Sequence, residues 1–123
     1  MLRTLIVDDE QPARDELAYL LASHEDIDLC EASSVDEALE VLAVKPIDLV
    51  LLDIQMPGRN GFDLLREIAC EPQPPFVVLV TAFDQHAVRA FEENAVDYLL
   101  KPVAPERLAR ALDRVRKLAA DRA

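Results

Sequence analysis

The feature that most constrains this chain is a regular alternation between short apolar runs and stretches whose apolar residues recur at helical spacing. Clear apolar runs lie at residues 5–7, 47–52 and 76–80, and a helical stripe runs along Ala104, Leu108, Leu112, Val115 and Ala119. This rhythm predicts five strands and five helices in strict alternation. Such βαβ units have right-handed crossovers, so the sequence predicts an α/β fold with one parallel sheet covered on both faces.

Composition also predicts the position of each strand in the sheet. The three apolar runs do not alternate with polar residues, as is typical of interior parallel strands. Residues 27–31 do alternate, and residues 95–98 contain the charged Asp97, so both segments suit the sheet edges. The strand order 2-1-3-4-5 satisfies all five segments. In open sheets of this kind, ligands bind beyond the carboxyl ends of the strands, at the point where the order reverses.

Length and charge narrow the class of protein. The 123 residues fit one ordinary domain, and 13 Lys and Arg against 24 Asp and Glu give a net charge of −11, which repels a nucleic-acid backbone. The apolar runs are far shorter than the roughly 20 residues that a membrane span requires. Cys30 and Cys70 lack metal-binding or redox spacing, and no signal-peptide pattern opens the chain. We therefore expect a soluble cytoplasmic protein that contacts neither membrane nor nucleic acid directly.

Two helix starts are signalled locally. Ser34 followed by Glu37 has the spacing of a capping box. Pro105 suits the first turn of the last helix, because the amide hydrogen that proline lacks has no partner there.

Polar residues with complementary chemistry follow the predicted strands. Asp8 and Asp9 come after the first strand, Asp53 ends the third, Thr81 ends the fourth, and Lys101 follows the fifth. The carboxyl ends of parallel strands share one edge, so these side chains should converge there. Crowded carboxylates repel one another unless a cation lies among them. A ligand set made only of oxygen favours a hard ion such as Mg²⁺.

This set of groups suits phosphoryl transfer. A carboxylate beside a divalent ion and a lysine can attack a phosphoryl group whose negative charge would otherwise repel it. Asp53 is the best nucleophile, because it stands alone at the tip of a central strand, whereas Asp8 and Asp9 are placed to hold the metal. Thr81 can donate a hydrogen bond to a phosphoryl oxygen, and Lys101 can pair first with Asp53 and then with the phosphate.

These segments resemble the receiver domain of two-component response regulators. The resemblance covers nearly the whole chain and rests on four motifs: Val7-Asp8-Asp9-Glu10, Leu52-Asp53-Ile54-Gln55-Met56-Pro57-Gly58, Thr81-Ala82 and Asp97-Tyr98-Leu99-Leu100-Lys101-Pro102. It implies a flavodoxin-like (βα)5 sandwich of three layers with the strand order given above. It also implies that Asp53 accepts a phosphoryl group from a sensor histidine kinase.

The resemblance assigns a metal set and a switch. Asp9, Asp53 and the backbone carbonyl of Gln55 would ligate Mg²⁺, with Asp8 acting through water. The family's switch pair would be Thr81 and Tyr98, and the bond between Lys101 and Pro102 would be cis. Beyond self-phosphorylation and slow autodephosphorylation, no enzymatic turnover is implied.

The segment from residue 90 to residue 102 is similar to receivers attached to LytTR-type DNA-binding domains. One departure from many receivers is Asn94-Ala95 in place of Gly-Ala, a turn that Asn tolerates because it adopts positive φ. This similarity implies that residues 1–123 are the receiver part of a longer transcription factor. A stand-alone chemotaxis or phosphorelay protein is the alternative.

Phosphorylation is expected to repack the face formed by the fourth helix, fifth strand and fifth helix, and to favour a homodimer. Residues of both charges on this face suit salt bridges across a twofold axis: Arg89, Glu92, Asp97, Arg107, Arg110, Asp113 and Arg114. Each exposed pair of this kind contributes only about 0–1 kcal/mol, so we expect the pairs to set register.

Other interpretations of the same residues remain open. The acidic residues after the first strand could be a solvated helix start, and Asp53, Thr81 and Lys101 could be turn and surface residues. A hydrolase of the haloacid-dehalogenase type also uses a strand-end aspartate, but it requires a second aspartate two residues later, where this chain has Gln55. A degenerate receiver that binds partners without phosphorylation would not need the intact set of acids, threonine and lysine.

Overall fold

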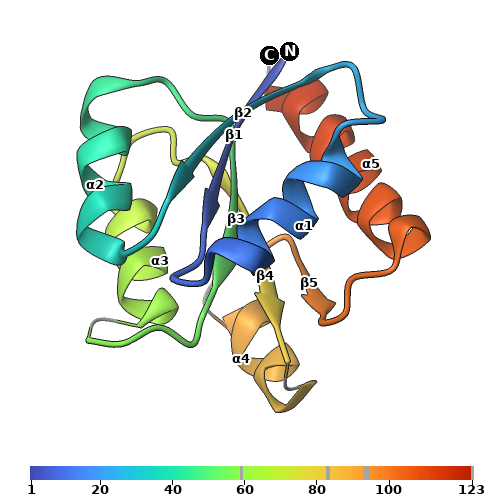
Figure 1. Cartoon of the computed structure of the whole chain (residues 1–123). Coiled ribbons are helices and arrows are strands. Elements are labelled where there is room, and N and C mark those ends of the chain that lie inside the picture. The colour runs from blue at the N-terminus through green and yellow to red at the C-terminus, as the bar shows by residue number, and fades with distance from the viewer. Residues whose placement is uncertain (59, 83, 93–94, 123) are drawn as a thin grey trace.

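The computed structural model describes residues 1–58, 60–82, 84–92 and 95–122, and within them strands and helices alternate as predicted. The strands are β1 (Leu2–Val7), β2 (Ile27–Ala32), β3 (Leu49–Asp53), β4 (Phe76–Thr81) and β5 (Asp97–Leu100). The helices are α1 (Gln11–Leu21), α2 (Val35–Val44), α3 (Gly61–Ala69), α4 (Ala87–Glu92) and α5 (Pro105–Arg122), with a short 3-10 helix, η1 (Asp84–His86), before α4. Figure 1 shows the chain running through these elements.

The five strands form one sheet in the order β2-β1-β3-β4-β5, and every neighbouring pair is parallel. The predicted strand order is therefore confirmed. The position of β5 differs from the prediction, because it begins at Asp97 and not at Ala95. The Ala95 amide donates to the Ala90 carbonyl at 2.9 Å, so the chain is still turning out of α4 at that point. Asn94 lies outside the described residues.

Two apolar cores hold the three layers together. One lies between the sheet and α1 and α5, and includes Leu17, Leu21, Leu108 and Leu112. The other lies on the opposite face, where α2, α3 and α4 pack against the sheet around the buried Phe62. Figure 1 shows α1 and α5 on one side of the sheet and α2 and α3 on the other. The predicted flavodoxin-like α/β sandwich is confirmed.

The helix starts follow local chemistry. The Ser34 hydroxyl accepts from the Glu37 amide at 3.1 Å, as its sequence spacing predicts, but the Glu37 carboxylate accepts from Ser33 instead of returning to the cap. A complete capping box occurs at α3, where Asn60 and Asp63 each bind the other's backbone amide. Pro105 is the first residue of α5, as predicted.

Helix α4 has six residues. Ala90 is its described buried residue, whereas Val88 is 70% exposed. The Arg89 guanidinium carbon lies 4.1 Å from the centroid of the Phe62 ring, a cation–π contact that joins α4 to α3.

An ion pair between a buried carboxylate and a partly exposed guanidinium joins β5 to α5. Asp97 is 5% exposed, and its two carboxylate oxygens accept from the Arg107 guanidinium at 2.6 Å and 3.0 Å and from the Tyr98 amide at 2.8 Å. Burial by itself would raise the pKa of Asp97, but these hydrogen bonds outweigh it and hold that pKa below its ordinary value. Asp97 and Arg107, which we expected to offer charge to a second chain, are therefore paired with each other within this chain.

We predict that Asp97→Asn lowers the free energy of unfolding at pH 7 by about 1.5–3 kcal/mol, the range for hydrogen bonds to charged groups. A carboxylate with a lowered folded pKa stabilises the protein fully above its unfolded pKa of about 3.9. The stabilisation is lost as the pH falls through the folded pKa.

Urea unfolding of wild type and variant between about pH 7 and pH 3 measures this effect. The difference between the two proteins should be constant near neutrality and should shrink at the acid end. A difference that stayed unchanged across the whole range would show that the Asp97 charge contributes nothing.

Candidate functional site

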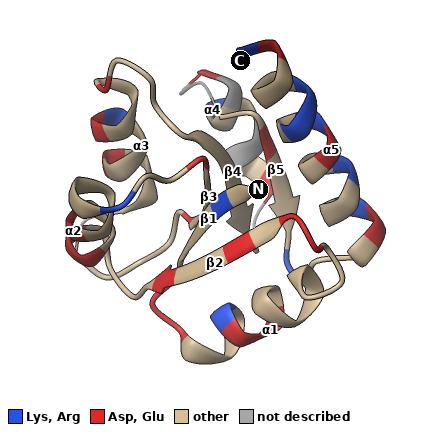
Figure 2. Ribbon diagram, turned by 90° about the horizontal axis from the view of Figure 1, so that it is seen from above, with Lys and Arg blue, Asp and Glu red and all other residues tan. Residues whose placement is uncertain are grey.

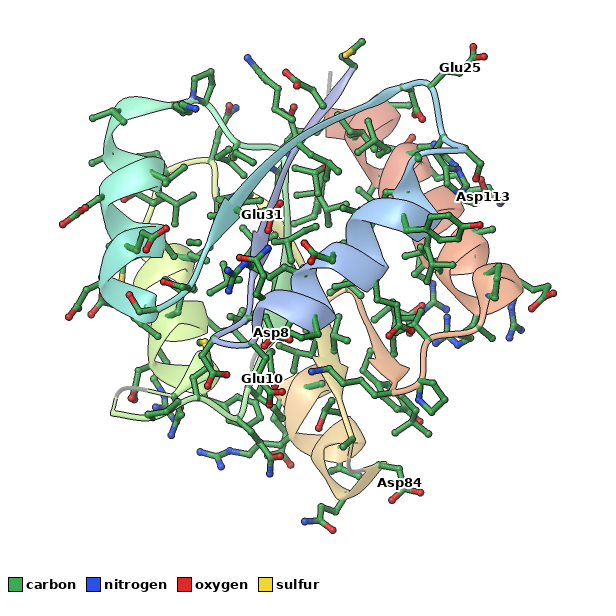
Figure 3. All side chains as sticks on the ribbon, in the orientation of Figure 1. Asp8, Glu10, Glu25, Glu31, Asp84 and Asp113 are labelled. Carbon is green, nitrogen blue, oxygen red and sulfur yellow. The ribbon has the colours of Figure 1, made fainter. Side chains whose placement is uncertain are left out.

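The carboxyl ends of four strands bring the polar residues of the predicted site to one edge of the sheet. Asp53 and Thr81 are the last residues of β3 and β4, Asp8 directly follows β1, and Lys101 directly follows β5. Figure 3 shows Asp8 and Glu10 at this edge, where the chain enters α1. The site is thus assembled from segments up to 93 residues apart in the chain.

Three carboxylates form the centre of the site. Asp8, Asp9 and Asp53 each offer an oxygen, and these three atoms lie within 4.8 Å of one another. Asp8 is 1% exposed and Asp53 is 7% exposed, whereas Asp9 is exposed. Oxygen ligands that carry negative charge match a hard divalent cation such as Mg²⁺. The exposed Asp9 leaves one side open to solvent, through which an ion can enter.

Lys101 compensates part of the negative charge. Its ammonium nitrogen lies 2.9 Å from an Asp8 oxygen and 3.3 Å from an Asp53 oxygen. Its backbone is held as well, because the Lys101 amide donates to the Thr81 carbonyl at 2.7 Å and the bond to Pro102 is cis. Burial would lower the pKa of Lys101, but the hydrogen bonds and charges of Asp8 and Asp53 raise it above its ordinary value.

The surroundings of Asp53 oppose its negative charge more than the surroundings of an ordinary surface carboxylate do. One of its oxygens accepts a hydrogen bond from the backbone amide of Gln55 at 2.9 Å, and the other accepts from the Lys101 ammonium. Burial raises the pKa of Asp53, and the neighbouring Asp8 charge adds to this, against the lowering effect of the Gln55 amide and Lys101. A cation bound between the aspartates would favour the charged form of Asp53, which is the form able to act as a nucleophile.

The loop after Asp53 is fixed by close backbone contact. The Gly61 amide donates to the Ile54 carbonyl at 3.2 Å, and a Cβ at Gly61 would lie 2.6 Å from the Ile54 Cα and 2.8 Å from the Asp53 carbonyl oxygen. Only glycine fits at this distance. Sequence reasoning missed this residue, although the chain has only two glycines, which is itself a signal that each has a backbone role.

The predicted switch residues share one face of the sheet. Thr81 is fully buried at the end of β4, and Tyr98 on β5 is half-buried against the core beneath α2, α3 and α4. In the parallel register, Tyr98 lies beside Leu79 and Leu100 lies beside Thr81. Thr81 and Tyr98 are therefore neighbouring positions on the same side of adjacent strands. Gln55 is an exposed residue, and the group that contacts the Asp53 carboxylate is the backbone amide of Gln55.

One further residue at the site carried no sequence signal. Arg14 on α1 donates to the Asp8 carbonyl oxygen at 2.6 Å and reaches Glu31 on β2. Nothing in the spacing of Arg14 distinguishes it from an ordinary residue on a helix surface, because its partners are a backbone atom and a side chain from another strand.

Comparison with known proteins identifies the class. Residues 4–113 match the response regulator receiver domain family, and the chain belongs to that family. It is 43% identical over 122 residues to the sensory transduction protein LytT of Bacillus subtilis, a match covering 98% of this chain and 51% of the relative. An uncharacterized response regulatory protein of Vibrio cholerae is 49% identical over 116 residues, covering 94% of this chain and 48% of the relative.

Solved structures agree with this assignment. The response regulatory domain of protein mrkE from Klebsiella pneumoniae superimposes with a TM-score of 0.87 at 32% identity, covering 95% of this chain and 97% of that one. A receiver domain from Clostridium thermocellum has a TM-score of 0.84 at 31% identity, covering 97% and 99%. The predicted family is confirmed, and relatives named LytT and LytR agree with the similarity to LytTR-type regulators.

Two further findings concern the length of the relatives and the helices of this chain. The chain spans about half the length of the curated relatives it matches. Among the residues described, there is no helix with the length and apolar character needed to cross a membrane.

We predict that Gly61→Ala destabilises the protein by about 1–3 kcal/mol, because the added methyl group meets backbone atoms that cannot rotate away. The backbone at Asp53 and Ile54 must shift to make room, so their amide resonances should move in the NMR spectrum.

Gly58→Ala is the matched control. Gly58 has φ +77° and open space around it, so an added methyl group there strains only the local turn and should leave the Asp53 amide unchanged. Wild-type stability and an unmoved Asp53 resonance in Gly61→Ala would refute the proposed contact.

Proposed function

We propose that this chain is a phosphorylation-dependent switch in which Asp53 accepts a phosphoryl group from a sensor histidine kinase. The observation that supports this most directly is the convergence of Asp8, Asp9 and Asp53 around the Lys101 ammonium at the carboxyl edge of the sheet. An Asp53 carboxylate oxygen would form the new bond to phosphorus as the bond between phosphorus and the kinase histidine nitrogen breaks. The histidine leaves with the electron pair of that bond.

The acidic residues would hold Mg²⁺ in this proposal. Asp9, Asp53 and the backbone carbonyl of Gln55 would be the direct ligands, and Asp8 would act through water. When bound, the ion would supply positive charge to offset that of the phosphoryl oxygens. Once Asp53 is phosphorylated, its carboxylate no longer carries a charge and the phosphoryl oxygens do, so the Lys101 ammonium turns from the Asp53 carboxylate to the phosphoryl oxygens. Thr81 donates its hydroxyl hydrogen to the same group.

The response is a shift between two arrangements of one face. Thr81 moves toward the phosphoryl group, Tyr98 fills the space this opens, and the surface of α4, β5 and α5 repacks. A phosphoryl group can only bias an existing equilibrium, by the difference in its interaction with the two states. Val88 on α4 and Leu100 on β5 are 70% and 42% exposed, and they offer apolar area that a second copy of the chain can cover.

Charge supports a homodimer through this face. Figure 2 shows basic and acidic residues along α5, in a chain whose net charge is −11. Asp97 and Arg107 are occupied within the chain, so the exchanged pairs fall to Glu92, Arg110 and the remaining exposed charges. These rim pairs set register more than affinity.

The proposed output is transcription. We propose that residues 1–123 are the receiver part of a longer cytoplasmic regulator that carries a DNA-binding domain. Support comes from the LytT relatives, which are about twice this length, and from the acidic charge, which disfavours nucleic-acid binding by the receiver itself. Cys30 and Cys70 are both free thiols, which fits a reducing compartment. A hydrolase function is disfavoured, because Gln55 has no acidic proton to donate.

We predict that acetyl phosphate with Mg²⁺ phosphorylates wild type and leaves Asp53→Asn unmodified, because an amide cannot replace the carboxylate nucleophile. Intact-mass spectrometry measures the added phosphoryl group. Asp28→Asn, at an exposed acid on β2, is the matched control and should be modified like wild type. Chelation of Mg²⁺ should abolish modification of wild type and of Asp28→Asn. Equal modification of Asp53→Asn and wild type would refute the assignment of the nucleophile.

We further predict that beryllofluoride with Mg²⁺ strengthens self-association of wild type by about 5–150-fold, the usual range of coupling between two sites. Lys101→Ala should still accept phosphoryl groups but should not respond in this way, since it lacks the ammonium that turns to the phosphoryl oxygens. Sedimentation velocity measures self-association, and Lys45→Ala, an exposed lysine beside α2, serves as control. A normal dimerisation response in Lys101→Ala would contradict the role given to its ammonium.

A further inference from the structure

Asp9 depends on the backbone for its position. Among the described residues, the Asp9 carboxylate has no hydrogen bond, yet one of its oxygens lies within 4.8 Å of oxygens from Asp8 and Asp53. Asp53 and Asp8 are held in place by Lys101 and by the amides of Gln55 and Glu10. The location of the Asp9 carboxylate therefore follows from the orientation of the peptide between Asp8 and Asp9.

That peptide is held by a side chain from α1. Arg14 donates from Nη1 to the Asp8 carbonyl oxygen at 2.6 Å, which fixes the carbonyl end of the peptide plane. The Asp8 amide, at the other end of the same residue, donates to the Ala32 carbonyl of β2 at 3.1 Å. Both backbone groups of Asp8 are thus anchored from outside the loop, and the chain enters Asp9 in one direction.

All three guanidinium nitrogens of Arg14 are used. Nε donates to the Glu31 carboxylate on β2 at 3.0 Å, and Nη2 donates to the Gln11 amide oxygen at 2.6 Å. Gln11 is itself held by a bond from its amide nitrogen to Asp15 at 2.7 Å. The Arg14 side chain is only 11% exposed. Figure 3 places Glu31 on β2 and Asp8 at the mouth of α1, the two sides that Arg14 joins.

From this geometry we infer that Arg14 is a positioning residue for the divalent cation. Its rigid fork links β2 to the peptide between Asp8 and Asp9, and so holds the Asp9 carboxylate where it can share an ion with Asp53. This inference rests on the proposed function, because it takes Mg²⁺ as the ion that these acids bind. Lysine cannot replace arginine here, since an ammonium lacks the planar fork that meets three partners at once.

Charge and geometry predict effects of opposite sign, which makes the role testable. A cation beside an acidic cluster repels Mg²⁺, so if Arg14 acted only through its charge, its removal would tighten Mg²⁺ binding. If Arg14 acts by holding the peptide, both its removal and its replacement by lysine weaken Mg²⁺ binding.

The test is Mg²⁺ titration of the unphosphorylated protein by isothermal calorimetry. We expect Arg14→Lys and Arg14→Met to raise the Mg²⁺ dissociation constant about 10–100-fold, the range for partners that orient metal ligands. Arg3→Lys is the matched control. Arg3 makes a comparable fork to Asp48 at the opposite end of β1 and should leave Mg²⁺ affinity unchanged. Wild-type affinity in Arg14→Lys, or tighter binding in Arg14→Met, would overturn the inference.

Glu31→Gln keeps the inference testable if the Arg14 variants do not fold. This substitution weakens the anchor of the fork and leaves Arg14 in place, so Mg²⁺ affinity should fall several-fold while the melting temperature without Mg²⁺ changes little. Asp28→Asn removes an equal charge from β2 without touching the fork, and it should lower the affinity less. A role limited to stability would move the melting temperature and leave the affinity of the folded protein unchanged. Unaltered affinity in Glu31→Gln would also overturn the inference.

Failure of this inference is separable from failure of the proposed function. Wild type that binds Mg²⁺ and is phosphorylated, beside variants that bind Mg²⁺ equally well, would remove only the role of Arg14. Wild type that bound no Mg²⁺ would overturn both.

Discussion

Repulsion among carboxylates at the end of the parallel sheet is the constraint to which the rest of the site responds. Asp8 and Asp53 are almost fully buried next to each other, an arrangement that raises the pKa of Asp53. Lys101 offsets part of this repulsion by donating to both acids. Asp9 adds a further negative charge on the solvent side of the cluster. A bound divalent cation, or a change in the charge of Asp53, therefore changes the electrostatic attraction between Lys101 and these acids.

The surrounding elements keep these acids in place from three directions. The sheet supplies the common edge, Gly61 brings the start of α3 against the backbone of Asp53 and Ile54, and Arg14 ties the first loop to β2. Each of these contacts involves main-chain atoms next to a site residue. Packing and hydrogen bonding of the main chain beside the acids thus determine the geometry of the acids and preorganise the anionic site.

Sequence reasoning predicted the strand order and the shared edge, because apolar runs mark interior strands and parallel strands end together. For the same reason it predicted that Asp8, Asp9, Asp53 and Lys101 lie together at the carboxyl edge of the sheet. It did not predict that Asp97 is buried, because its partner Arg107 lies ten residues away on another element and a charge on an edge segment suggests exposure. Partnerships of this kind, like that of Arg14, depend on packing between elements that the spacing of residues does not encode.

The Asp97–Arg107 clamp has a mechanical consequence for the face that we propose as the dimer surface. Since a bidentate ion pair with a buried carboxylate joins β5 to α5, tilting one against the other would take the Arg107 guanidinium away from the buried Asp97 charge, at an energetic cost. The short helix α4 is joined to α3 by the contact between the Arg89 guanidinium and the Phe62 ring. A rearrangement of this face should therefore move β5 and α5 together as one rigid unit instead of bending one against the other.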